Sequence, residues 1–146
     1  MFSYNELLSK LKSHGLRITP QRRVLLTIFY TCSDKILSVP TLFEEATKEY
    51  SDLNLSTLYR NLQQLEALHI IHRLILEDGK DYFTLVCEED HHHHIICTRC
   101  GKKIVLNYCP YNELLAAAAS KNFKLTGHSI LLYGLCNQCA SKSPLE

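Results

Sequence analysis

Two C-x-x-C pairs constrain this chain more than any other feature. Cys97 and Cys100 form the first pair, and Cys136 and Cys139 form the second. Each pair can direct two thiolates at one metal ion from a tight turn, so the pairs together match a closed tetrahedral zinc site. A redox dithiol or two disulfides are the alternatives, but a thioredoxin-like motif would be single and would precede a helix in a strand–helix–strand unit. We therefore expect a structural Zn²⁺ ion held by these four cysteines.

The cysteines are unevenly distributed along the 146 residues. One of the seven lies in residues 1–86 and six lie in residues 87–146. An odd number fits a disulfide framework poorly, no apolar run approaches the ~18 residues of a membrane span, and residues 1–30 lack a signal peptide's apolar block. We expect a cytoplasmic protein without membrane contact, with a join near residue 86 between domains 1–86 and 87–146.

The first half carries the signals of helices. Thr19 can cap a helix that has Pro20 in its first turn, Ser38 opens a second helix, and Asn54 or Ser56 caps a third. Apolar residues then recur at helical spacing after each start.

A hairpin signal follows these helices. Two apolar runs, residues 70–76 and 81–86, are joined through Asp78-Gly79, a dipeptide typical of tight hairpin turns. Three helices followed by a hairpin is the order of a winged helix-turn-helix. Another small helical domain with a hairpin is the alternative.

The second half predicts a small α/β domain. Residues 95–97 and 103–108 have the pattern of short strands around a turn, a helix starts at Pro110, and a last strand runs from residue 123 to residue 135. The overall expectation is an α+β protein.

The run His91–His94 is a second candidate for metal binding. In an extended strand it sends His91 and His93 to one face and His92 and His94 to the other, so one run can supply two sites. A solvated histidine-rich loop is the alternative.

We expect Cys32 and Cys109 to be packing residues. Further donors are His72, Cys87, Glu113 and His128.

No enzyme signature is present. The chain lacks H-E-x-x-H, G-x-S-x-G, a phosphate-binding glycine loop and the zinc-deaminase pattern. Four protein ligands would also leave a zinc ion no open position. We expect neither an enzyme nor a small-molecule substrate.

Four segments together resemble the ferric uptake regulator superfamily over nearly the whole chain. This resemblance implies a metal-dependent transcriptional repressor that binds double-stranded operator DNA as a homodimer. It also implies an N-terminal winged-helix domain and a C-terminal dimerisation domain. The matching segments are residues 16–22, 55–62, 91–100 and 133–139.

Within that superfamily the chain resembles the zinc uptake regulators. Iron and peroxide sensors carry an acidic ligand before the histidine run, whereas this chain has Thr84, Leu85 and Val86 followed by Cys87. A thiolate among imidazoles favours zinc over Mn²⁺ or Fe²⁺. The expected function is zinc-responsive repression of zinc uptake genes. An iron-responsive or peroxide-sensing regulator with Fe²⁺ or Mn²⁺ is one alternative, and a zinc-ribbon interaction module without metal-regulated DNA binding is another.

This resemblance leads to two further metal sites. The expected sensor straddles the domain join, so that filling it selects the DNA-binding conformation, and consists of His72, Cys87, His92 and His94. A possible third site would tie the histidine strand to the dimerisation domain and consists of His91, His93, Glu113 and His128.

The third helix is the expected recognition helix in the major groove. We expect it to face outward with Thr57, Arg60, Asn61 and Gln64. Arg60 and Asn61 would read base edges, and Ser56 and Thr57 would hold phosphates. By resemblance, Tyr59 would contact a thymine methyl group or the DNA backbone.

A basic face lies near the start of the chain. The whole chain has 16 basic and 15 acidic residues, but residues 1–30 contain five basic residues against one acidic, a local charge of +4. Arg17, Gln21 and Arg22 are the expected DNA contacts there. Such contacts give steep salt dependence.

Overall fold

The computed structural model describes residues 2–86 and 92–142 of the chain. The chain divides into two compact units, residues 1–88 and 89–146. None of the described helices is long and apolar enough to cross a membrane.

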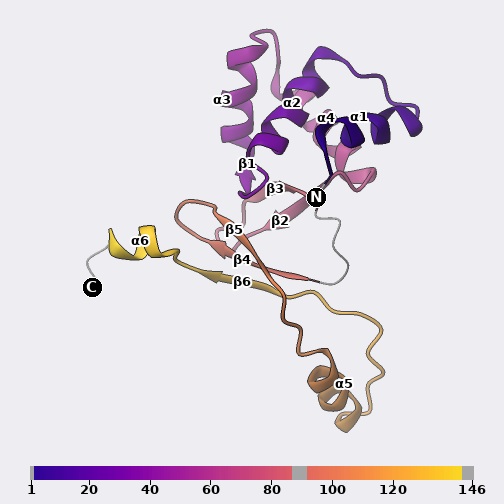
Figure 1. Ribbon diagram of the computed structural model, residues 1–146, viewed down its shortest axis with the longest axis vertical. Coiled ribbons are helices and arrows are strands. Elements are labelled where there is room, and N and C mark those ends of the chain that lie inside the picture. Colours follow the sequence, from indigo (N-terminus) through magenta and orange to yellow (C-terminus); the bar gives the residue numbers. More distant parts are fainter. Residues whose placement is uncertain (1, 87–91, 143–146) are drawn as a thin grey trace. The chain divides into compact units, whose positions relative to one another are not determined.

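The first unit contains the helices and the hairpin that the sequence predicts, together with one additional helix and a short strand (Figure 1). Its elements are α1 (Tyr4–Ser13), α2 (Pro20–Thr31), β1 (Leu37–Ser38), α3 (Val39–Glu49), α4 (Leu55–Ala67), β2 (Ile71–Ile75) and β3 (Asp81–Leu85).

Polar side chains fix where the helices of this unit begin. The Thr19 hydroxyl accepts from the backbone N–H at the third position of α2, and the Ser38 hydroxyl does the same for α3. Of the two caps that the sequence left open for α4, Asn54 is the one used, since its Oδ1 accepts from the Thr57 N–H at 2.9 Å. The unpredicted α1 begins at a capping box made by Ser3 and Glu6.

A continuous apolar core holds the first unit together. The inner stripe of α4, Leu58, Leu62 and Leu65, is at most 1% exposed. The stripe does not continue to His69, because α4 ends at Ala67 and His69 is exposed with a φ of 54°. The α4 stripe packs with Leu7, Leu11, Leu25, Leu26, Phe29, Leu42, Ile71 and Phe83.

The hairpin forms the wing of the winged helix. Its sheet has the order β1-β3-β2, and β2 pairs antiparallel with β3 from Ile71 opposite Leu85 to Ile75 opposite Asp81. Gly79 adopts a φ of 74° at the turn, a conformation that costs glycine little. The predicted order of helices and hairpin is thus confirmed.

The second unit is a small sheet with two helices, α5 and α6. Its sheet has the order β5-β4-β6, with β4 antiparallel to β5 and parallel to β6. Within this unit α5 stands apart from the sheet at the end of two long connections (Figure 1). The elements are β4 (His93–Cys97), β5 (Lys103–Leu106), α5 (Tyr111–Ser120), β6 (Leu131–Gly134) and α6 (Asn137–Ser141).

Two features of this unit differ from the sequence prediction. The last strand is confined to Leu131–Gly134, because pairing with the short β4 sets its length. The short helix α6 was not predicted, since its five residues, Asn137–Ser141, are too few to show an apolar period.

Replacing the α4 cap tests this account of the first unit. We expect Asn54→Ala to lower the free energy of unfolding by about 1 kcal/mol, because the Thr57 N–H loses its acceptor. Ser56→Ala, in the first turn of α4, should change it by less than about 0.5 kcal/mol. Urea titration of both variants followed by circular dichroism measures this. Equal losses in the two variants would contradict the assignment of Asn54 as the cap.

Candidate metal centres and nucleic-acid interface

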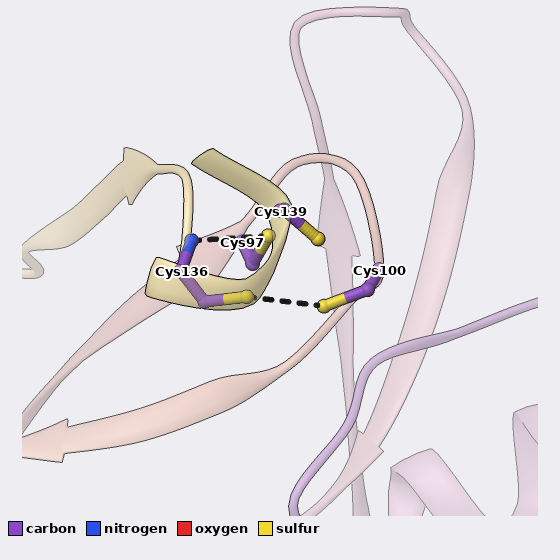
Figure 2. Close-up of side chains that lie close together, drawn as sticks. All are labelled: Cys97, Cys100, Cys136 and Cys139. Carbon is purple, nitrogen blue, oxygen red and sulfur yellow. Dashed lines mark hydrogen bonds between the residues drawn. The ribbon is translucent and has the colours of Figure 1, made fainter. Parts of the chain in front are cut away.

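Four cysteines converge at one end of the second unit's sheet (Figure 2). Their Sγ atoms all lie within 4.8 Å of one another. The Sγ atoms of Cys100 and Cys136 are 3.8 Å apart. Zinc–sulfur bonds of about 2.3 Å in a tetrahedron separate neighbouring sulfur atoms by about 3.8 Å. The donor set and its spacing therefore fit the structural zinc ion expected for Cys97, Cys100, Cys136 and Cys139.

The backbone explains why these cysteines meet. The parallel pairing of β4 with β6 places Cys97 opposite Gly134, so that Cys136 follows directly beside the end of β4. Gly101, with a φ of 75°, turns the chain after Cys100 and donates its N–H to the Cys97 carbonyl at 2.9 Å. The Cys136 N–H donates to the Cys97 Sγ at 3.4 Å.

The local electrostatics prepare the cluster for a cation. Burial opposes ionisation of Cys97, but N–H groups of Cys100, Cys136 and Arg99 outweigh it and lower the pKa of its thiol to about 6. Burial and the neighbouring thiols raise the pKa of Cys139 to about 12. The Cys97 and Cys139 thiols, with their pKa values shifted in opposite directions, thus ionise unequally without metal. A divalent cation removes the repulsion that opposes full ionisation.

A second cluster brings together His93, Cys109 and His128. Their ligand atoms also lie within 4.8 Å of one another, and the Cys109 Sγ is 3.0 Å from the His128 Nε2. His93 and His128 belong to the predicted third site. Glu113 is not part of this cluster, and His91 lies outside the described residues. Cys109, which we expected to be a packing residue, is half-buried, and its sulfur also lies against His128 in the segment before α5.

The expected sensor residues are described in part. The rings of His92 and His94 lie 4.7 Å apart at 88°. The Nδ1 of His92 is buried and has no hydrogen-bond partner among the described residues. His72 is exposed on β2 in the first unit, and Cys87 lies outside the described residues. The sensor set therefore stays a prediction.

The exposed side of α4 differs in one residue from the expected DNA-reading face. Ser56, Tyr59 and Arg60 are exposed, and Thr57 is half-buried. Asn61 is 6% exposed and its Nδ2 donates to the Thr57 carbonyl at 2.9 Å. Sequence reasoning placed Asn61 outward, but it lies three residues after Leu58 and four before Leu65, on the core side of the helix.

The N-terminal basic face contains a contact between helices. Arg17 is exposed and Gln21 is half-buried. The Arg22 guanidinium donates through Nη1 to the Arg17 carbonyl at 2.7 Å and through Nη2 to the Gln64 Oε1. Arg22 therefore joins the start of α2 to α4, the expected recognition helix. Sequence reasoning assigned it to DNA alone, because no local pattern reveals a partner 42 positions away.

Loss of one thiolate tests the four-cysteine site. We expect Cys97→Ser to bind one zinc ion fewer per protomer and to lose amide-exchange protection throughout β4, β5 and β6. A structural zinc site supplies about 10–16 kcal/mol in small zinc peptides, so this small unit depends on it. Metal analysis by mass spectrometry and hydrogen exchange make the measurement, with Cys32→Ser in the first unit as control. Unchanged zinc content in Cys97→Ser would contradict the site.

Comparison with known proteins places this geometry in a family. The model of the ferric uptake regulator family matches residues 13–133. The ferric uptake regulation protein of Neisseria meningitidis serogroup A is 30% identical over 143 residues, which cover 97% of this chain and 98% of that protein.

Solved structures show the same relationship. The ferric uptake regulator of Helicobacter pylori matches with a TM-score of 0.72 and 25% identity, over 97% of each chain. A zinc-bound manganese uptake regulator matches with a TM-score of 0.69 and 30% identity, over 89% of this chain and 98% of that chain. The fold, the likeness over almost the full length and the metal-binding clusters agree with a metal-responsive transcriptional regulator that is not an enzyme. The chain belongs to the ferric uptake regulator family.

Proposed function

We propose that this protein is a zinc-responsive repressor that binds palindromic operator DNA and controls zinc uptake genes. One observation carries the choice of metal: among the described residues, one cluster with metal-ligand geometry consists of four cysteines, the other of one cysteine and two histidines, and neither contains a carboxylate. Thiolate and imidazole suit zinc, whereas Mn²⁺ prefers carboxylate and other oxygen ligands. The relatives named for iron and manganese keep an iron- or manganese-responsive regulator as the alternative.

The exposed surface of α4 supports duplex DNA as the partner. Tyr59 is 45% exposed and Arg60 is also exposed, while the opposite face of α4 is in the core. A helix held this way can enter the major groove, where an arginine forms paired hydrogen bonds with guanine. Phosphates would be bound by Ser56 and Thr57 in the first turn of α4 and by Arg17 and Gln21 near the start of α2. Asn61 is left out of this set because it is buried.

The second unit supports a homodimer. No residue of α5 is buried in the single chain, although its sequence is mostly leucine and alanine. A contiguous apolar surface of this kind marks an interaction site. A second copy of the chain would cover it, and a two-fold dimer would match the two halves of a palindrome. The exposed apolar side chains include Ile104, Val105, Leu114, Phe123 and Leu132.

Metal control would use His72, Cys87, His92 and His94. The paired rings of His92 and His94 and the buried Nδ1 of His92 support this set. Metal bound preferentially in the DNA-binding conformation raises DNA affinity, and DNA must raise metal affinity by the same factor. Coupling of about 1–3 kcal/mol would change operator affinity about 5- to 150-fold.

Operator binding at buffered metal concentrations tests this function. We expect duplex DNA affinity to rise about 5- to 150-fold with free Zn²⁺, and Fe²⁺ or Mn²⁺ at cellular concentrations to have less effect. Cys87→Ser and His92→Ala should lose the zinc response, because each removes a sensor ligand. His14→Ala, an exposed histidine in the first unit, is the matched control. Gel-shift titration with selected operator fragments measures the response.

Each result of that titration decides between the alternatives. An equal or stronger response to Fe²⁺ or Mn²⁺ would favour an iron- or manganese-responsive regulator. A zinc response that survives both sensor substitutions would refute the ligand set. If no metal promotes duplex binding, the chain acts as an interaction module instead.

The recognition helix gives a separate prediction. We expect Arg60→Ala to weaken operator binding by about 1–3 kcal/mol and to relax specificity at one base pair, because a base-edge contact is lost. Lys121→Ala removes the same charge in the second unit and should leave specificity unchanged. Fluorescence anisotropy with a set of point-substituted operators measures both. A uniform loss across all operators would identify Arg60 as a phosphate contact.

A further inference from the structure

We propose that His93, Cys109 and His128 form a mixed sulfur–nitrogen site for Zn²⁺, in which the Cys109 thiolate is a direct ligand. The site is separate from the four-cysteine cluster, shares no residue with the expected sensor and needs no DNA. Three stretches of the second unit supply it: β4 provides His93, the segment between β5 and α5 provides Cys109, and the segment between α5 and β6 provides His128.

The distances suit a single ion. Bonds of about 2.3 Å to sulfur and about 2.05 Å to nitrogen separate the two donors by about 3.6 Å in a tetrahedron. The Cys109 Sγ lies 3.0 Å from the His128 Nε2, and the three ligand atoms all lie within 4.8 Å of one another. Small side-chain rotations are therefore enough to admit an ion. Three protein ligands leave the fourth position for a water molecule.

The surroundings hold the imidazoles in place. His93 is 5% exposed, and its ring centroid lies 5.1 Å from that of His128. The Tyr111 ring stacks on the His128 ring, with 5.0 Å between the ring centroids and an angle of 28° between the ring planes. Cys109 and His128 are half-buried. A simple hydrogen bond between Cys109 and His128 would explain the approach of two side chains only. The buried His93 ring brings a third ligand atom to the same point, as a metal site requires.

The donors also indicate which ions can bind. One thiolate and two neutral imidazoles leave a net charge of +1 with a divalent ion, and binding displaces the thiol proton to solvent. A soft sulfur donor with two imidazoles favours zinc over Mn²⁺. With Glu113 as a ligand instead, the site would be richer in oxygen and would accept Mn²⁺ more readily.

The position of the site gives it a structural effect. Cys109 precedes α5 and His128 follows it, in the segment between β5 and β6. A shared ion would tie both residues to His93 in β4 and so to the sheet. Since no residue of α5 is buried in the single chain, its orientation depends on these two connections. An ion that ties both ends to β4 would fix the surface we assign to the homodimer, and this last step rests on that assignment.

Cobalt titration of the metal-free full chain tests the ligand role of Cys109. Cys109→Ser should bind one Co²⁺ ion fewer per protomer and lose part of the sulfur-to-cobalt charge-transfer absorption. Cys32→Ser should retain both, as should Glu113→Gln, which keeps the size of the side chain that the sequence suggested as a ligand. The inference is overturned if Cys109→Ser retains the full stoichiometry and absorption, or if Glu113→Gln is the variant that loses an ion.

Alkylation of the wild-type protein gives a second test that does not depend on the stability of a variant. Zn²⁺ should slow iodoacetamide labelling of Cys109 at least tenfold, read by peptide mass spectrometry, while labelling of Cys32 stays unchanged. His128→Gln should abolish that protection. Labelling of Cys109 that does not respond to Zn²⁺ would overturn the site. Neither readout involves DNA, so failure here is distinguishable from failure of the zinc-responsive repressor.

Discussion

The convergence of four thiols at the end of β4 is the constraint on which the second unit depends. Few apolar side chains are buried there, and among the described residues Ile96 is the one aliphatic side chain in the interior. Burial of so little apolar surface cannot offset the entropy of ordering a unit of this size. Metal–thiolate bonds would replace the missing core, because they would connect the turn after β4 to α6 directly.

The first unit is stabilised by different chemistry. Its helices share a core of leucines with Phe29 and Phe83, and the wing packs on that core through β3. The first unit therefore has a core of its own that includes no cysteine ligand of the four-cysteine cluster. A metal ion at the four cysteines would act on the second unit, which has little core, so folding and metal binding would be linked there while α4 stays packed in the first unit.

Local signals predicted much of this structure. The caps at Thr19 and Ser38, the Asp78-Gly79 turn and the C-x-x-C spacings act over a few residues, so sequence alone could reveal them. Longer-range contacts could not be predicted. The pairing of Arg22 with Gln64 and the approach of Cys109 to His128 depend on tertiary packing. The capping box of α1 was a local signal that sequence reasoning missed.

One strand carries several of the proposed metal ligands. His93, His94 and Cys97 all belong to β4, whose side chains alternate between two faces. A shift of its pairing by one residue would therefore exchange the faces of every ligand at once. Parallel pairing with β6, from His94 opposite Leu131 to Cys97 opposite Gly134, sets that alignment. Evolution can alter any single ligand of this strand, but an insertion or deletion within it would dismantle all the sites together.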